Sequence, residues 1–102
     1  MKNNFKTYYV GKVVIYDTLF MLDENSKEQS FDNIVDIKTL VAGPNKEVVI
    51  EMLVDYIKEN FGIEDEVEIA QPLINGKKFE KPENGYTFQI DEVLAPSIME
   101  VL

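Results

Sequence analysis

The 102-residue chain contains no cysteine and no histidine. Without cysteine it can form no disulfide, and it has no thiol nucleophile and no thiolate metal ligand. Histidine is the commonest general base near neutral pH and a frequent zinc ligand, so its absence removes most hydrolase triads and most zinc sites. We therefore expect a protein that is not an enzyme, with no catalytic residue, no cofactor and no metal site.

Arginine is missing as well. All ten basic residues are lysine and stand against nineteen acids, which leaves a net charge of −9. Arginine is the side chain that binds phosphates and carboxylates in a bidentate way. Its absence, together with the negative charge, argues against direct binding to nucleic acid or anionic membranes. The charge favours a basic partner, although acidity that only keeps a small protein in solution is the simpler alternative.

Long apolar runs are also lacking. No stretch approaches the roughly 20 apolar residues of a membrane-spanning helix. The early lysines are not followed by the apolar segment of a signal peptide, so a cytoplasmic protein is expected. The length and a hydrophobic fraction of 45% predict one folded domain, residues 1–102, with a single core.

The clearest element present is a helix over residues 45–61. Asn45 suits the N-cap, and Gly62 follows where left-handed backbone is needed. At about 100° per residue, the apolar side chains fill an arc of roughly 200°, wider than the stripe of an ordinary surface helix. We expect the helix to be covered twice, once by a sheet and once by a second helix, another copy of the chain or a partner.

An acidic ridge follows this helix and continues beyond it. Its first four members recur every fourth residue, a spacing at which like charges destabilise an isolated helix. Four more acids come just after the helix, near a C-terminal end that prefers cations. Both groups of acids are therefore placed unfavourably, which indicates that they serve a function such as binding a partner. The alternative is that they only form a solvated face. The predicted partner-binding residues are Glu47, Glu51, Asp55, Glu59, Glu64, Asp65, Glu66 and Glu68.

Several segments are predicted as strands. Aromatic and β-branched residues indicate strands over 5–16, with a bulge or a bend at Gly11, and over 18–22. A turn over 23–28 leads into a short strand to residue 31. Residues 66–70 alternate like a strand, and Asn75-Gly76 is typical of a hairpin turn. A second turn at 82–85 precedes a strand over 86–93.

Residues 32–41 are compatible with two structures. Ile34, Ile37 and Leu40 follow a helical spacing behind a possible cap at Asp32, while the β-branched content would also allow a strand. A short second helix is the preferred interpretation. The predicted fold class is α+β: an antiparallel sheet of about four to five strands, packed on one face by the central helix 45–61 with helix 32–41 beside it. The apolar end, residues 95–102, is expected to dock on the core or on a partner.

Three functions fit these features. The first is a small acidic protein that binds and neutralises a basic protein, plausibly a nuclease or another nucleic-acid-binding protein. Immunity proteins and phage-encoded inhibitors of host defence nucleases, including anti-CRISPR proteins and DNA mimics, have this role. The second is a structural or assembly subunit of a phage or mobile element, acting as a homodimer. The third is an enzyme that uses paired carboxylates, for example among Asp17, Asp91 and Glu92.

Overall fold

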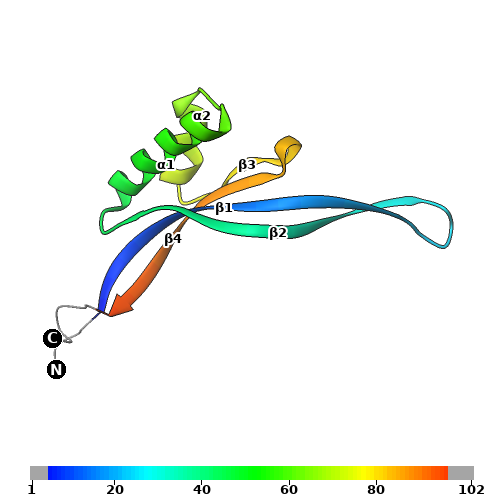
Figure 1. Ribbon diagram of the computed structural model, residues 1–102, viewed down its shortest axis with the longest axis horizontal. Coiled ribbons are helices and arrows are strands. Elements are labelled where there is room, and N and C mark those ends of the chain that lie inside the picture. The colour runs from blue at the N-terminus through cyan, green and yellow to red at the C-terminus, as the bar shows by residue number, and fades with distance from the viewer. Residues whose placement is uncertain (1–4, 97–102) are drawn as a thin grey trace.

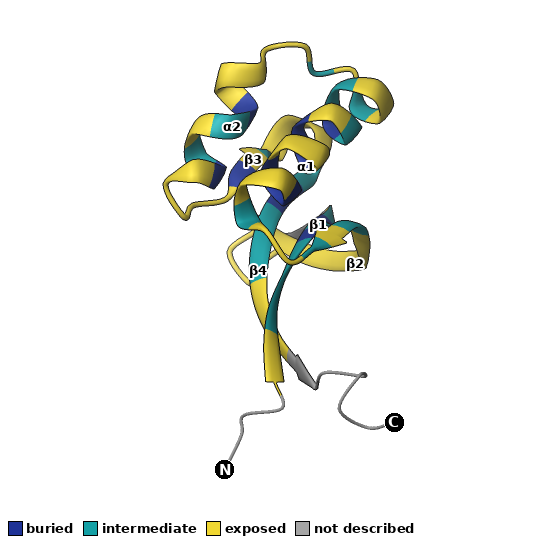
Figure 2. Cartoon of the chain, turned by 90° about the vertical axis from the view of Figure 1, so that its left-hand side faces the viewer, coloured by how far each residue is buried: buried dark blue, intermediate teal, exposed yellow. Residues whose placement is uncertain are grey.

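The chain builds one antiparallel sheet in the order β2-β1-β4-β3, with two helices against one of its faces (Figure 1, Figure 2). The computed structural model describes residues 5–96, except for the side chains at 18–21, 95 and 96. The strands are β1 (Phe5–Leu22), β2 (Glu28–Gly43), β3 (Phe79–Lys81) and β4 (Tyr86–Pro96). The helices are α1 (Lys46–Phe61) and α2 (Glu66–Ile74), and a short 3-10 helix, η1 (Pro82–Asn84), joins β3 to β4. The expected α+β class is confirmed.

Strand β1 is longer than predicted. The two expected strands, 5–16 and 18–22, are one strand of 18 residues. Its register against β2 shifts between Gly11 and Lys12, but the extra residue there is Leu40 of β2, so the irregularity lies opposite Gly11 and not within β1; the register shifts again between Ile15 and Tyr16. Gly11 is needed at the first shift because an added Cβ would lie 2.7 Å from a methyl group of Val41 and 3.2 Å from one of Leu53.

The predicted helix over 32–41 is wrong. These residues belong to β2, which pairs antiparallel with β1 from Gly43 to Glu28. The helical spacing of the apolar residues was accidental, and the β-branched side chains at Ile34, Val35 and Ile37 suit a strand better. Pairing with the long neighbouring strand supplies backbone hydrogen bonds that an isolated short helix could not replace.

The predicted strand over 66–70 is also wrong, because these residues form α2. Asp65 is its N-cap and accepts hydrogen bonds from the backbone N–H groups of Val67 and Glu68. Asn75 and Gly76 therefore end a helix instead of forming a hairpin turn: the Asn75 N–H donates to the Gln71 carbonyl, and Gly76 has a φ of +73°.

The core lies between the sheet and α1, with α2 closing one side. Leu53 and Ile57 of α1, Ile69 of α2 and Phe88 of β4 are fully buried. On β4, which confirms the strand predicted over 86–93, Tyr86 and Ile90 also pack against this cluster. The turn at Gly85 joins β3 and β4 as a hairpin. Residues 97–102 of the apolar end lie outside the described residues.

Two ribbons leave this body in opposite directions (Figure 1). The arm consists of residues 16–22 and 28–34 with the turn between them, where β1 and β2 pair only with each other. The leg consists of residues 5–8 paired with 93–96. The chain measures 62 × 33 × 22 Å and has a radius of gyration of 17.7 Å, against about 13 Å for a compact domain of this length. Much of each ribbon therefore lacks a covering layer.

Candidate protein-binding groove

The two helices that form the groove are positioned by their ends. Asn45 accepts a hydrogen bond from the Val48 N–H at 3.1 Å and starts α1. Gly62, with a φ of 69°, ends it, as predicted. The short connection to Asp65 then brings α2 alongside α1, so the second cover predicted for α1 is α2.

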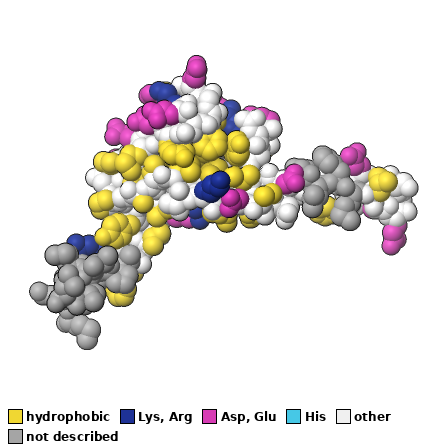
Figure 3. All heavy atoms as spheres, in the orientation of Figure 1, with side chains coloured by type: hydrophobic (Ala, Val, Ile, Leu, Met, Phe, Trp, Pro, Cys, Tyr) yellow, Lys and Arg dark blue, Asp and Glu magenta, His cyan; other side chains and the backbone are white. Residues whose placement is uncertain are grey.

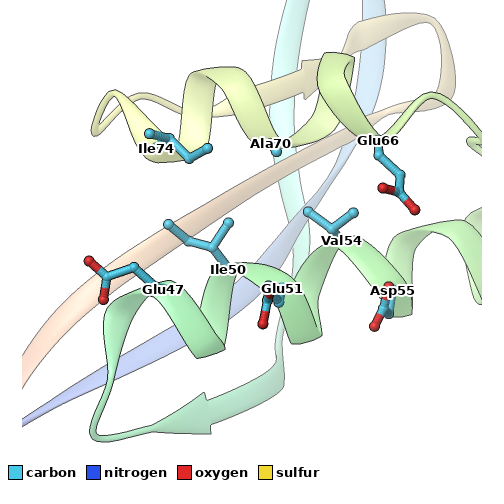
Figure 4. Close-up of a pocket in the computed structure, with 8 residues that line it drawn as sticks. All are labelled: Glu47, Ile50, Glu51, Val54, Asp55, Glu66, Ala70 and Ile74. Atoms are coloured by element: carbon cyan, nitrogen blue, oxygen red, sulfur yellow. The ribbon is translucent and has the colours of Figure 1, made fainter.

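The groove runs between α1 and α2 and has a volume of about 560 Å³. Its apolar lining comes from both helices: Ile50 and Val54 of α1 face Ala70 and Ile74 of α2 (Figure 4). Ile50 and Val54 are buried, whereas the Ile74 side chain is 60% exposed. Because the apolar surface opens to solvent along a channel instead of closing into a cavity, it suits an elongated occupant.

Carboxylates line the edges of this apolar channel. Three come from successive turns of α1 and one from the first turn of α2 (Figure 4); they are Glu47, Glu51, Asp55 and Glu66. Among the described residues, the side chains of Glu47, Glu51 and Asp55 make no hydrogen bond and no ion pair. The groove therefore combines an apolar floor with three carboxylates that the chain itself leaves unpaired.

The structure separates the eight predicted partner-binding residues into two groups. Glu47, Glu51, Asp55 and Glu66 line the groove, whereas Glu59 and Glu64 are exposed outside it. Asp65 and Glu68 have local roles: Asp65 caps α2, and Glu68 forms an ion pair with Lys81 at 2.9 Å. The acids after residue 62 are placed favourably after all, because three of them stand at the N-terminus of a helix.

One lysine lies near the groove. The Lys58 ammonium donates a hydrogen bond to the Glu66 carboxylate, which raises the pKa of Lys58; Asp55 and Glu64 raise it further. Since Lys58 stays protonated at neutral pH, it offsets one of the four carboxylates that line the groove. The remaining three give this surface a negative potential that would attract a cationic segment.

Sequence reasoning missed the half of the groove that α2 supplies. A usable signal was present: Asp65 is followed three residues later by Glu68, the spacing of a capping pair. Ala70 and Ile74, which line the groove, then recur four residues apart, as on one face of a helix. The alternation over 66–70 hid this pattern.

The carboxylates considered for an enzyme are far apart or paired. Asp91 pairs in register with Val10, and Asp17 lies seven residues further along β1, a separation of roughly 23 Å in an extended strand. Asp91 also forms an ion pair with Lys12. This contact, with a hydrogen bond from Gln89, lowers the pKa of Asp91, opposite to the shift of a general acid. No group of three or more potential metal-ligating side chains occurs within residues 5–96.

The Lys12–Asp91 pair predicts a specific pH dependence. Because folding lowers the pKa of Asp91, the ion pair stabilises the fold fully above the ordinary carboxyl pKa of about 4, and this contribution is lost as pH falls through the lowered value. Asp91→Asn should therefore cost about 1 kcal/mol or less at pH 7, since both side chains are partly exposed, and progressively less as the pH falls through the lowered pKa. Urea unfolding across pH 2–7 measures this, with Glu59→Gln as a control. A pH-independent cost would contradict the assignment.

No protein-family model, curated protein or solved structure matches the chain. Within the described part of the chain, no helix is long and apolar enough to cross a membrane.

Proposed function

We propose that the protein is a non-catalytic binding protein whose groove between α1 and α2 takes up a basic segment of a protein partner. The observation that supports this best is the apolar channel lined by unpaired carboxylates. An apolar floor alone would fit any hydrophobic segment, and acids alone would only solvate the surface. Together they select a segment with apolar side chains on one side and lysine or arginine beside them. Nucleic-acid-binding proteins, which present such basic segments, are the class we propose as the target.

Neutralising such a partner requires no chemistry from the chain. A basic segment that normally binds phosphates would be occupied by Glu47, Glu51 and Asp55, and the contact would raise the association rate through the opposite charges. The role is that of an inhibitor, whether of the immunity-protein or the phage anti-defence type, including anti-CRISPR proteins. The eight predicted acids then divide in function: the groove carboxylates contact the partner, and the others provide the long-range field.

Charge reversal inside the groove tests this proposal. Changing Glu47, Glu51 and Asp55 together to lysine should weaken partner binding by about tenfold or more, because three attractive contacts become repulsive. The fold should persist, since all three side chains are exposed. Proteins captured from a host lysate by the immobilised wild-type chain are identified, and the affinity of the purified partner is then measured for each variant.

A matched variant separates the groove from net charge. Changing Glu24, Glu28 and Glu59 to lysine alters the total charge by the same amount at exposed positions outside the groove. This control should keep most of the affinity and lose only part of its salt dependence. Equal loss in both triple variants would show that overall charge, and not the groove, drives binding. Unchanged binding in the groove variant would rule the groove out.

The arm favours a second candidate function, that of an assembly subunit. A two-stranded ribbon is at best marginally stable in water, and this one carries exposed apolar side chains at Leu22, Phe31 and Ile34. A ribbon of this kind gains stability when it packs against another subunit. The oligomeric state bears directly on this candidate: a chain that remains monomeric at high concentration would count against it.

A further inference from the structure

The outer edge of the sheet is open. Strand β2 is the outermost strand beside β1, and within residues 5–96 no other strand pairs with its outer side. Three apolar side chains close together on it, Ile34, Val35 and Ile37, are 54%, 60% and 52% exposed. An exposed, apolar edge strand is a template for pairing with a further strand. The side chains along this edge determine which strand can pair with it.

The charge of the edge indicates the occupant. Residues 33–43 contain one acid, Asp36, and one base, Lys38, so this segment is neutral in a chain of net charge −9. A basic partner would gain little here, in contrast to the groove. A second copy of this chain, which would be repelled by most of the acidic surface, can approach along this segment without a like-charge penalty.

Symmetry limits how two copies can pair. When two identical edge strands pair antiparallel about a two-fold axis, one residue must lie opposite itself, and its neighbours pair crosswise. Val35 and Leu40 are the residues of β2 that have no partner in the β1 register, so they mark bulges. The regular stretch between these bulges is residues 36–39, and the axis must therefore pass one of these four positions.

Charge then selects one position. An axis at residue 36 would place Asp36 opposite its own copy, and an axis at 38 would do the same for Lys38. Like charges directly opposite each other destabilise a strand pair, whereas opposite charges stabilise it. Only an axis at Ile37 sets Asp36 of each copy opposite Lys38 of the other. Within one chain these two side chains lie 3.8 Å apart and are 50% and 61% exposed, so both are accessible to a second copy.

Helix α1 extends the same surface. The sheet order puts β2 and β3 at opposite edges, and α2 contacts β3 while α1 contacts β2. The side of α1 turned away from the groove therefore faces the open β2 edge. Met52 falls toward that side at about 100° per residue and is 36% exposed. Hydrophobic side chains form a band across the body in this region (Figure 3).

We propose that two copies of the chain pair antiparallel through their β2 edges, with Ile37 opposite Ile37 and two Asp36–Lys38 pairs across the interface. The result is a continuous sheet through both copies, bordered on one face by Met52. This interface does not include the groove between α1 and α2, so it stands or falls independently of the proposed binding function.

Charge exchange at the interface tests both the pairing and its register. By sedimentation equilibrium at 1–100 µM, the wild-type chain should have twice its single-chain mass of 11.7 kDa. Asp36→Lys alone and Lys38→Asp alone should each weaken dimerisation by about tenfold, because both cross-strand pairs become repulsive. The double variant restores opposite charges and should return to within about twofold of wild type. The double variant also restores the pair within each chain, so an equimolar mixture of the two single variants is measured as well. In that mixture opposite charges meet only across the interface, and mixed dimers should form about tenfold more tightly than dimers of either single variant alone.

Cross-linking gives a second measurement. Because the chain has no cysteine of its own, an introduced cysteine can form a disulfide only with its counterpart in another copy. Residues directly opposite in a strand pair have Cβ atoms close enough for a disulfide, so Ile37→Cys should form a covalent dimer under mild oxidation. Leu22→Cys, at a more exposed position on the arm, should nevertheless cross-link at least about tenfold more slowly. A wild-type chain that is monomeric at 100 µM, equal cross-linking of the two cysteine variants, or a double charge variant no better than the single ones would overturn the proposal.

Discussion

Replacing Phe88 by alanine is expected to lower the free energy of unfolding by about 3–5 kcal/mol, the usual cost of deleting a buried aromatic ring. Phe88 is fully buried at the centre of the core. Its ring contacts Phe61 edge-on at a centroid distance of 5.0 Å and stacks with Phe79 at 5.9 Å. The change would leave a cavity where α1, β3 and β4 meet, so both helices would lose their anchorage to the sheet.

Thermal and urea unfolding measure this effect. For a domain of this size the melting temperature should fall by more than about 10 °C. Val67→Ala is a suitable control, because Val67 is 69% exposed on α2 and its truncation should change stability by about 0.5 kcal/mol or less. If Phe88→Ala lowered the free energy of unfolding no more than Val67→Ala does, Phe88 would not lie at the centre of the core.

Replacing Gly85 by alanine should cost about 2–4 kcal/mol through two separate effects. Gly85 has a φ of +74°, where an added Cβ is strained, and that Cβ would lie 2.7 Å from the backbone oxygen of Tyr16. The Tyr16 N–H donates to the Gly85 carbonyl at 2.8 Å, so the two segments cannot move apart without losing this hydrogen bond. The turn before β4 and the start of the arm would shift together.

Gly76 offers a matched comparison. Its φ of +73° is almost the same, but nothing lies within 4 Å of an added Cβ. Gly76→Ala should therefore show the backbone strain alone, about 1–2 kcal/mol, and the difference between the two variants measures the contact with Tyr16. Equal costs in urea unfolding would mean that the turn at Gly85 is not held against β1.

The elements predicted correctly carry their own local signals. Helix α1 has a cap at Asn45 and a terminator at Gly62, and β4 has strict alternation around Phe88. Residues 32–41 and 66–70 were assigned wrongly because their patterns fit two structures. The choice depended on partners elsewhere in the chain: β1 for the first segment, and α1 with β3 for the second. For residues 32–41 no local signal records this pairing, whereas for residues 66–70 the capping pair of Asp65 and Glu68 was present and was overlooked.

The candidate site was predicted in part. The acids of α1 that line the groove were identified from their four-residue spacing, and Glu66 was included for a different reason, its place in an acidic cluster. The groove itself could not be predicted, because its other wall is α2, which was taken for a strand. The role of Asp65 as a cap was missed for the same reason. Which of these acids contact a partner stays a prediction.

The 18 residues of β1 run without interruption from the leg through the core to the end of the arm. A tension applied between the two ribbons would act along this one strand, because β4 alone pairs with it in the leg and β2 alone pairs with it in the arm. The backbone hydrogen bonds on both sides of β1 would then be loaded in shear, many at once, and would not open one after another. The same continuity means that a torque on the arm acts directly on Val13, which β1 contributes to the core. A force on one ribbon would therefore reach the other through the folded centre of the chain.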